Sequence, residues 1–121
     1  NRLQFAVLRE ALHLLSEGVA SAEDIDAAMT AGPGLRYGLL GPLRTADLGG
    51  LDVFHAISGY LFEELSAARE PPALLSDLVE KKQLGAKTGQ GFYTYSETEL
   101  KKTIAKRDKV LIEFLKILDR E

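Results

Sequence analysis

Apolar residues near the start of the chain recur every three or four positions, which is the stripe of a helix that packs on one side. The stripe consists of Phe5, Leu8, Ala11, Leu12 and Leu15. Gly18 predicts the end of this helix. Ser21 then precedes Glu23 and Asp24, which is typical of an N-cap followed by acidic residues in the first turn of a second helix.

Glycine and proline interrupt the helical pattern twice in the following stretch. Gly32-Pro33-Gly34 breaks it first, and we expect a loop from there to residue 40. Gly41-Pro42 begins another helix, because proline suits the first helical position.

A longer helix is predicted after Gly49-Gly50, half-buried along one side. Its apolar side carries Val53, Ile57, Tyr60, Leu61, Leu65 and Ala68. Pro71-Pro72 ends it and opens a shorter helix, which we expect to close near two lysines, Lys81 and Lys82.

The last part of the chain combines an extended loop with a long helix. Residues 87–95 have some strand character but are too isolated to form a sheet. Ser96 and Glu99 form a capping box, and the helix behind it is predicted to be the longest. Its stripe consists of Leu100, Ile104, Leu111, Phe114, Leu115 and Leu118. The pattern as a whole predicts an all-α bundle, with residues 1–121 as one domain.

Composition places the chain among ordinary globular domains. It has 121 residues, 45% of them hydrophobic and 27% charged, with a formal net charge of -3 and no Cys. Its charges are interspersed, so we expect no nucleic-acid partner. No apolar run is long enough to cross a bilayer, and we expect no membrane association and a cytoplasmic location. The lack of Cys excludes disulfides and thiolate chemistry within these residues.

The residues capable of catalysis are few. His13 and His55 each lie beside an apolar stripe, and we interpret both as solvated histidines at the edge of a helix. No metal-ligand spacing is present in the sequence, so we expect no metal site. The chain alone does not carry the groups of a self-contained enzyme.

Three polar residues admit two interpretations each. Asn1 suits an N-cap or a donor in an active site. Arg36, between glycines, suits an internal salt bridge or an anionic ligand. Lys87 stands among glycines whose order does not match a phosphate-binding P-loop. It either reaches a bound anion or belongs to a turn that lets the following aromatic residues pack.

The motifs in their order resemble the C-terminal domain of L-3-hydroxyacyl-CoA dehydrogenases. The matching residues are Asn1-Arg2-Leu3, Glu10-Ala11, Glu17-Gly18-Val19-Ala20-Ser21, Asp24-Ile25-Asp26, Ala28-Met29, Gly41-Pro42, Asp47-Leu48, Gly50-Leu51-Asp52 and Lys87-Thr88-Gly89-Gln90-Gly91-Phe92-Tyr93. The resemblance implies an all-α domain of the 6-phosphogluconate-dehydrogenase-like type, which closes the active site and forms a homodimer.

In this family an N-terminal Rossmann domain binds NAD and carries a catalytic His, paired with Glu, and a Ser. The sequence holds no such domain and begins without Met, its single Met being Met29, so we expect the Rossmann domain upstream of Asn1. The resemblance implies that Asn1 lies in the active site, where it holds the reacting oxygen or an attendant water. It implies that Lys87 contacts the NAD cofactor.

One loop departs from the short-chain acyl-CoA enzymes. Residues 35–42 read Leu-Arg-Tyr-Gly-Leu-Leu-Gly-Pro, which is more similar to the branch containing L-gulonate dehydrogenase and lambda-crystallin. We expect Arg36, Leu40 and Pro42 to contact the substrate. The first hypothesis is oxidation of a short 3-hydroxyacyl-CoA to the 3-oxoacyl-CoA in fatty-acid or butanoate metabolism. The alternatives are a small carboxylated hydroxy acid held by Arg36, or a module that only dimerises.

Overall fold

The computed structural model describes residues 1–119 and confirms the all-α prediction. Its regular elements are helices, and the described residues outside them form only two isolated bridges, Gly85 with Gln90 and Gln90 with Thr94. The chain divides into two compact units, Asn1–Ser76 and Asp77–Glu121.

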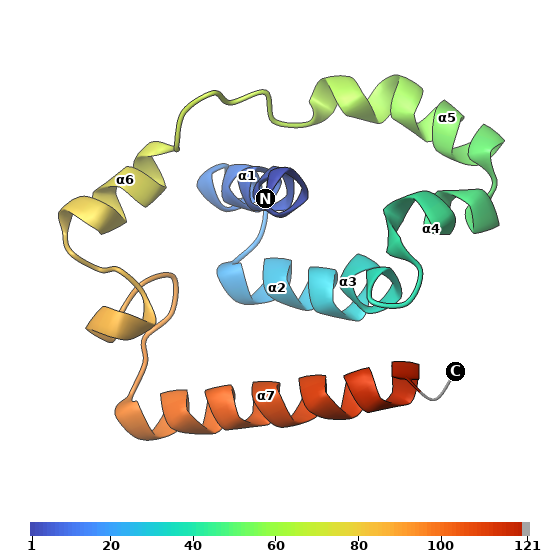
Figure 1. Ribbon diagram of the computed structural model, residues 1–121. Coiled ribbons are helices and arrows are strands. Elements are labelled where there is room, and N and C mark those ends of the chain that lie inside the picture. Colours follow the sequence, from blue (N-terminus) through green and yellow to red (C-terminus); the bar gives the residue numbers. More distant parts are fainter. Residues whose placement is uncertain (120–121) are drawn as a thin grey trace. The chain divides into compact units, whose positions relative to one another are not determined.

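The first unit follows the chain through consecutive helices, each packed against the next in sequence from α1 to α5 (Figure 1). Its complete elements are α1 (Arg2–Ser16), α2 (Ala22–Ala31), α3 (Pro33–Tyr37), α4 (Gly41–Gly49), α5 (Leu51–Leu61) and the 3-10 turn η1 (Phe62–Glu64). The predicted caps hold, because the Ser21 hydroxyl accepts from the Asp24 N–H at 3.1 Å. Leu12, in the middle of the predicted stripe, is 6% exposed.

The loop predicted over residues 32–40 is wrong at its start, where the chain forms α3. Gly32 is its N-cap and a proline occupies its first turn, where the missing N–H costs nothing. The glycine at 34 permits a close approach of two backbones. A Cβ on Gly34 would lie 2.7 Å from the carbonyl oxygen of Met29. These glycines therefore allow α2 and α3 to pack closely.

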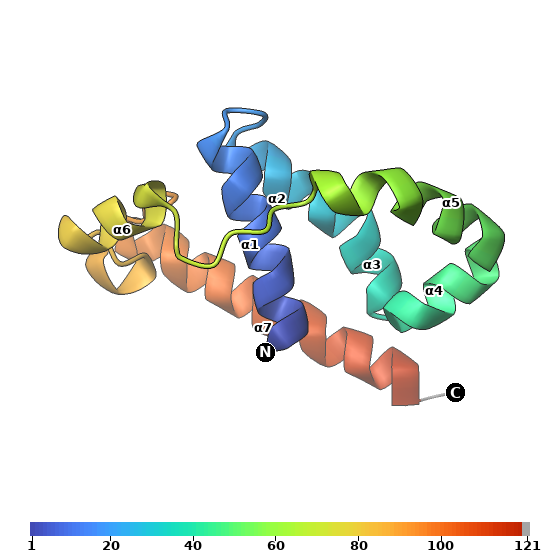
Figure 2. The same cartoon turned by 90° about the horizontal axis from the view of Figure 1, so that it is seen from above.

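The helix predicted to reach Ala68 ends earlier. α5 stops at Leu61, η1 follows, and Leu65 is already extended. The segment after it is fastened to α1 by two hydrogen bonds. The Ser66 N–H donates to Glu10 Oε2 at 2.9 Å, and Arg9 Nη1 donates to the Ala68 carbonyl at 3.4 Å. Figure 2 shows this segment running over α1.

The prediction that α5 is half-buried is also wrong. Its large apolar side chains are exposed, including Leu51 at 60%, Val53 at 49% and Tyr60 at 61%. An amphipathic pattern predicts that a face will be covered, but it does not say whether the cover comes from the same chain.

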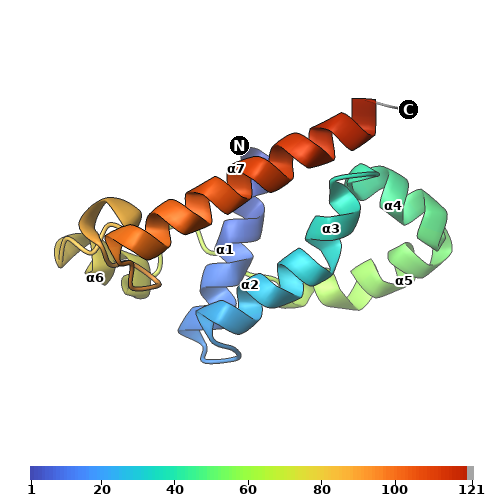
Figure 3. The same cartoon turned by 90° about the horizontal axis from the view of Figure 1, so that it is seen from below.

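The second unit begins within α6 and continues with a short 3-10 turn, η2, and a long helix, α7. α6 (Ala73–Glu80) confirms the predicted short helix, and the 3-10 turn η2 (Ala86–Thr88) stands where an extended loop was predicted. The last helix, α7 (Glu97–Asp119), has 23 residues and is the longest, as predicted. It is continuous and nearly straight (Figure 3). The N-cap half of the predicted capping box is present, because the Glu99 N–H donates to the Ser96 hydroxyl at 3.2 Å.

Among the described helices, none combines the length and the hydropathy that crossing a membrane requires.

Candidate functional site

Asn1 occupies the N-cap position of α1 without capping it through its side chain. Its backbone carbonyl accepts from the Phe5 N–H at 2.8 Å, as an N-cap carbonyl does, while the side chain forms no cap hydrogen bond. The residue is exposed. Asn1 therefore holds the N-cap position, but the capping expected from its side chain is wrong, and the carboxamide is left available for another partner.

Arg36 lies in the last turn of the short helix α3, not in the loop that the glycines indicated. The ion pairs among residues 1–119 join Arg107 to Asp108 and Lys116 to Glu113, so Arg36 takes part in none. The internal salt bridge is thereby excluded within the described chain. An exposed guanidinium without a counter-ion can form a bidentate contact with a carboxylate or phosphate.

Leu40 and Pro42 lie close to Arg36 because the chain turns sharply between α3 and α4. The N–H groups of Leu39 and Leu40 both donate to the Arg36 carbonyl at 3.0 Å. Leu40 is the N-cap of α4 and Pro42 stands in its first turn. The backbone of Arg36 and Leu40 thus meets at one corner of the first unit, and Pro42 follows in the first turn of α4. Asn1 starts a different helix of that unit.

Lys87 belongs to the second unit, in the η2 turn. Its side chain is exposed and takes part in no ion pair among the described residues. The turn around it is closed by the backbone, because the Gly85 N–H donates to the Gln90 carbonyl and the Tyr95 N–H to the Gly89 carbonyl, both at 2.8 Å. Lys87 thus has no counter-ion among the described residues, and the hydrogen bonds of the turn fix its backbone.

Thr88 holds this turn together, a role that sequence reasoning missed. Its hydroxyl accepts from the Leu84 N–H at 2.8 Å and lies 3.1 Å from the Gln90 carbonyl and 3.2 Å from the Gly85 carbonyl. Gly91 packs directly on Gly85, since a Cβ there would lie 2.7 Å from the Gly85 Cα. The sequence signal for this role was a threonine between glycines, because a short hydroxyl side chain readily forms hydrogen bonds with nearby backbone groups.

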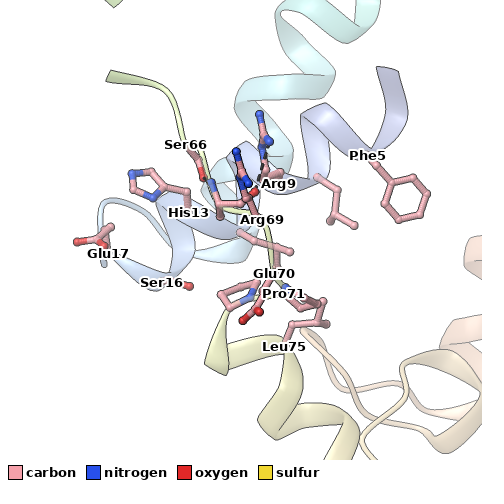
Figure 4. Close-up of a pocket in the computed structure, with 14 residues that line it drawn as sticks. Phe5, Arg9, His13, Ser16, Glu17, Ser66, Arg69, Glu70, Pro71 and Leu75 are labelled. Atoms are coloured by element: carbon pink, nitrogen blue, oxygen red, sulfur yellow. Dashed lines mark hydrogen bonds between the residues drawn. The ribbon is translucent and has the colours of Figure 1, made fainter. Parts of the chain in front are cut away.

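A pocket of about 410 Å³ lies along α1 in the first unit (Figure 4). It is lined by Phe5, Leu8, Arg9, Leu12, His13, Ser16, Glu17, Ser66, Ala68, Arg69, Glu70, Pro71, Pro72 and Leu75. None of the predicted site residues is among them. His13, which we interpreted as solvated, is half-buried and lines this pocket, whereas His55 is exposed as predicted.

A group of three or more metal-ligating side chains is not found within the described part of the chain.

The family model described as 3-hydroxyacyl-CoA dehydrogenase, C-terminal domain, matches residues 1–95. This match contains Asn1, the corner at Arg36 and the turn at Lys87. The chain belongs to the 3-hydroxyacyl-CoA dehydrogenase family. Helix α7 lies beyond the family domain.

Individual relatives fall into two groups by how much of the chain they match. A 3-hydroxybutyryl-CoA dehydrogenase of Mycobacterium tuberculosis is 44% identical over 96 residues, 78% of this chain and 32% of its own length. An L-carnitine dehydrogenase of Bacillus cereus is 34% identical over 127 aligned positions, which are 99% of this chain and 36% of its own length. The chain spans about a third of the length of these curated relatives.

A solved structure matches nearly the whole chain. It is a 5-formyl-3-hydroxy-2-methylpyridine 4-carboxylic acid 5-dehydrogenase, described as an NAD+-dependent dismutase. The TM-score is 0.96 at 30% identity, and the match covers 98% of this chain and 38% of that one. A protein of this name from Mesorhizobium japonicum is also 30% identical in sequence over 119 residues. These longer matches include α7.

Proposed function

We propose that this chain is the helical domain of an NAD-dependent dehydrogenase that oxidises a hydroxyl group to a carbonyl. The substrate carbon gives a hydride to NAD, and its hydroxyl proton goes to a base outside this chain. The dinucleotide and that base belong to a Rossmann domain that precedes Asn1. The proposal rests above all on the family match, which covers residues 1–95.

The role of Asn1 follows from its unused side chain. A carboxamide that does not cap its helix can donate to a polarised oxygen through its NH2 and accept from a water through its carbonyl. The fixed backbone of the helix start holds it in place. We expect Asn1 to hold the reacting oxygen of the substrate, where a preorganised donor lowers the barrier.

The test of this role uses two substitutions in the complete protein. Asn1→Ala and Asn1→Asp should each lower kcat by about 10²-fold, as the loss of one donor at a developing oxyanion does. The Asn1 side chain forms no cap hydrogen bond and a carboxylate suits a helix N-terminus, so Asn1→Asp should keep the thermal stability of the parent. Turnover of NADH by Asn1→Asp at the parent rate would show that the donor is not used.

NAD fits the turn at Lys87, because the cofactor is an anion and this turn presents a fixed cation without a counter-ion among the described residues. NAD supplies the hydride acceptor when bound. Lys87 would bind an anionic or polar group of the cofactor through its ammonium, as a point charge.

The first candidate substrate is a short 3-hydroxyacyl-CoA. It is favoured by the 44% identity to a 3-hydroxybutyryl-CoA dehydrogenase over 96 residues. This is a higher identity than the 30% to 37% of the relatives that match nearly the whole chain.

The second candidate is a small carboxylated hydroxy acid without CoA. Two observations favour it. Arg36 has no counter-ion among the described residues, and the relatives that match nearly the whole chain are named for L-carnitine and for a pyridine carboxylate. Arg36 would then bind the substrate carboxylate beside Leu40 and Pro42.

Substitution of Arg36 separates the two candidates. If the substrate is a free acid, Arg36→Met should raise its KM by 10-fold or more, because a charge-assisted bidentate contact contributes about 1.5 to 3 kcal/mol. Arg36→Lys should recover only part of the loss. Oxidation of a 3-hydroxyacyl-CoA should continue in Arg36→Met. The measurement is NADH production with each substrate class.

The exposed apolar surface supports a homodimer formed through this domain. Leu43 is 85% exposed, Leu48 72% and Phe62 69%, and surface of this kind marks a protein interface. A module that only associates would show the dimer but no turnover in the complete protein.

A further inference from the structure

The pocket along α1 lies between two parts of the first unit that hydrogen bonds hold together. One side is α1, and the other is the segment that follows η1. The Ser66 N–H donates to Glu10 Oε2 of α1 at 2.9 Å, and the Ala68 N–H donates to the Ser66 hydroxyl at 3.3 Å. All lining residues belong to Asn1–Ser76, so the first unit forms this pocket by itself.

Most of the pocket lining is apolar. Phe5, Leu8 and Leu12 follow one another along α1, and Leu75 comes from the first turn of α6. The two prolines before α6 also line the pocket, and their fixed φ angles limit the movement of this wall. The volume of about 410 Å³ lies in the range of roughly 300 to 1,000 Å³ that is usual for sites of small organic ligands.

Two arginines add positive charge to this apolar lining. Arg9 Nη1 donates to the Ala68 carbonyl at 3.4 Å, which brings its guanidinium to the residue just before Arg69. Figure 4 shows both guanidinium groups beside this segment. Neither arginine takes part in an ion pair among the described residues, so most of their N–H donors are available to a ligand.

The acidic residues of the lining do not neutralise these cations. Glu17 and Glu70 line the pocket and form no ion pair within the described chain. In Figure 4 both carboxylates lie apart from the guanidinium groups of Arg9 and Arg69.

The positive charge is unusual for this part of the chain. Residues 1–76 contain ten acidic residues, no lysine and five arginines, and two of these arginines line one pocket. The five are Arg2, Arg9, Arg36, Arg44 and Arg69. Concentrated cations beside apolar surface are complementary to an anion that has an apolar part.

We propose that this pocket binds a small amphipathic anion, such as an alkyl carboxylate. Its carboxylate accepts charge-assisted hydrogen bonds from Arg9 and Arg69, and its alkyl part contacts the apolar lining, where burial is favourable. Asn1, Arg36 and Lys87 do not line the pocket. The site therefore goes beyond the residues that we assign to hydride transfer and does not depend on them.

The anion has two possible sources, a separate metabolite or the far end of the dehydrogenase substrate. The second source is within reach because Phe5 lies one helical turn from Asn1, whose carbonyl accepts the Phe5 N–H at 2.8 Å. Both sources present the same chemistry to the pocket, and kinetics separate them.

Titration calorimetry of the complete protein with octanoate, octanol and octylamine tests the need for negative charge. Octanoate should bind about 10-fold or more tightly than octanol, because the chain length is the same and only octanoate can accept charge-assisted hydrogen bonds. Octylamine, a cation, should bind more weakly than either. Equal affinities for octanoate and octanol, or no binding of octanoate at millimolar concentration, would overturn the proposal.

Arg69→Met tests the cation, because it keeps an unbranched apolar side chain. Arg69 forms no hydrogen bond or ion pair among the described residues, so this variant should keep the thermal stability of the parent. Its affinity for octanoate should fall about 10-fold or more, with its affinity for octanol nearly unchanged. An unchanged affinity for octanoate would place the anion elsewhere and overturn the assignment.

Arg44→Met is the matched control. Arg44 is an exposed arginine of the same unit, has no ion pair among the described residues and does not line the pocket. This variant should bind octanoate as the parent does. An equal loss in Arg44→Met and Arg69→Met would mean that only overall charge matters, which also overturns the site.

Two neighbouring alanines test the position of the alkyl part. Ala68 lines the pocket and Ala67 does not, and both are exposed. Ala68→Phe should fill the space and weaken the binding of octanoate and octanol alike, whereas Ala67→Phe should bind both as the parent does. The opposite result would place the ligand outside this pocket.

Steady-state kinetics then assign the source of the anion. Competition between octanoate and substrate, with a raised substrate KM in Arg69→Met and an unchanged kcat, supports the pocket as the site of the far end of the substrate. Binding of octanoate without competition supports a separate metabolite. The titrations need no turnover, so a complete protein without dehydrogenase activity would overturn the proposed function and leave this site standing.

Discussion

The polar side chains proposed for the site differ from their neighbours in whether they form hydrogen bonds or ion pairs within the described chain. Asn1 forms no cap hydrogen bond, and Arg36 and Lys87 form no ion pair among the described residues. Glu10 and Thr88, which belong to the same sequence motifs, are bonded to backbone groups. The motifs therefore contain residues that build the fold and residues that the fold leaves available for binding.

The adjacent pair Lys87 and Thr88 allows this division to be tested. Thr88→Val keeps the shape but removes the hydroxyl that bonds Leu84, so it should lower the free energy of unfolding by about 1 to 2 kcal/mol. Lys87→Ala should leave that free energy within about 0.5 kcal/mol and should raise the KM for NAD. Urea unfolding and NADH kinetics of both variants are the measurements. The reverse pattern would mean that Lys87 supports the turn.

The sequence could indicate these residues only in part. Glycines around Lys87 indicated close backbone approach, but the partner of that approach, Gly85 against Gly91, depends on how the turn closes. For Arg36 the sequence left both an internal salt bridge and an anionic ligand open, because a salt bridge depends on which carboxylate the fold brings near. The structure excludes that bridge within its described residues.

At the scale of the elements, the sequence predicted helix starts correctly where the capping residue and its partner are close in sequence. The hydroxyls of Ser21 and Ser96 accept from the N–H three residues on, as their spacing predicted. The predictions failed where a tertiary contact decides. Residues 65–68 continue the apolar period of α5, yet Glu10 and Arg9 of α1 bond their backbone and hold them outside the helix.

The contact between Glu10 and Ser66 therefore fixes the course of this segment. Glu10→Ala should lower the free energy of unfolding by about 1 to 2 kcal/mol, because a part-buried N–H loses a charged acceptor. It should also speed hydrogen exchange at the Ser66 amide. Glu10→Gln retains an acceptor oxygen and should lose less than half as much. Equal losses in the two variants would mean that the charge, not the hydrogen bond, matters.

At the scale of the whole molecule, the fold class follows from helical periodicity, whereas burial does not. The stripes of α5 and α7 satisfy the rule for a covered helix face, yet the stripe of α5 remains largely exposed and that of α7 is exposed at Ile104, Leu111 and Leu115. A pattern of apolar residues records that a surface is hidden in the functional assembly. It does not distinguish a cover from the same chain, from a second copy or from a preceding domain.

The low burial has a calorimetric consequence. Within residues 1–119, Leu12 is the one buried hydrophobic side chain, and it is still 6% exposed. The heat capacity increment of unfolding grows with newly wetted apolar area, and residues 1–121 studied alone as a monomer have little such area left to wet. Their differential scanning trace should rise as a shallow slope without an endothermic peak. Association should restore a peak whose temperature climbs with protein concentration, so the melting of this molecule reports its assembly more than its chain.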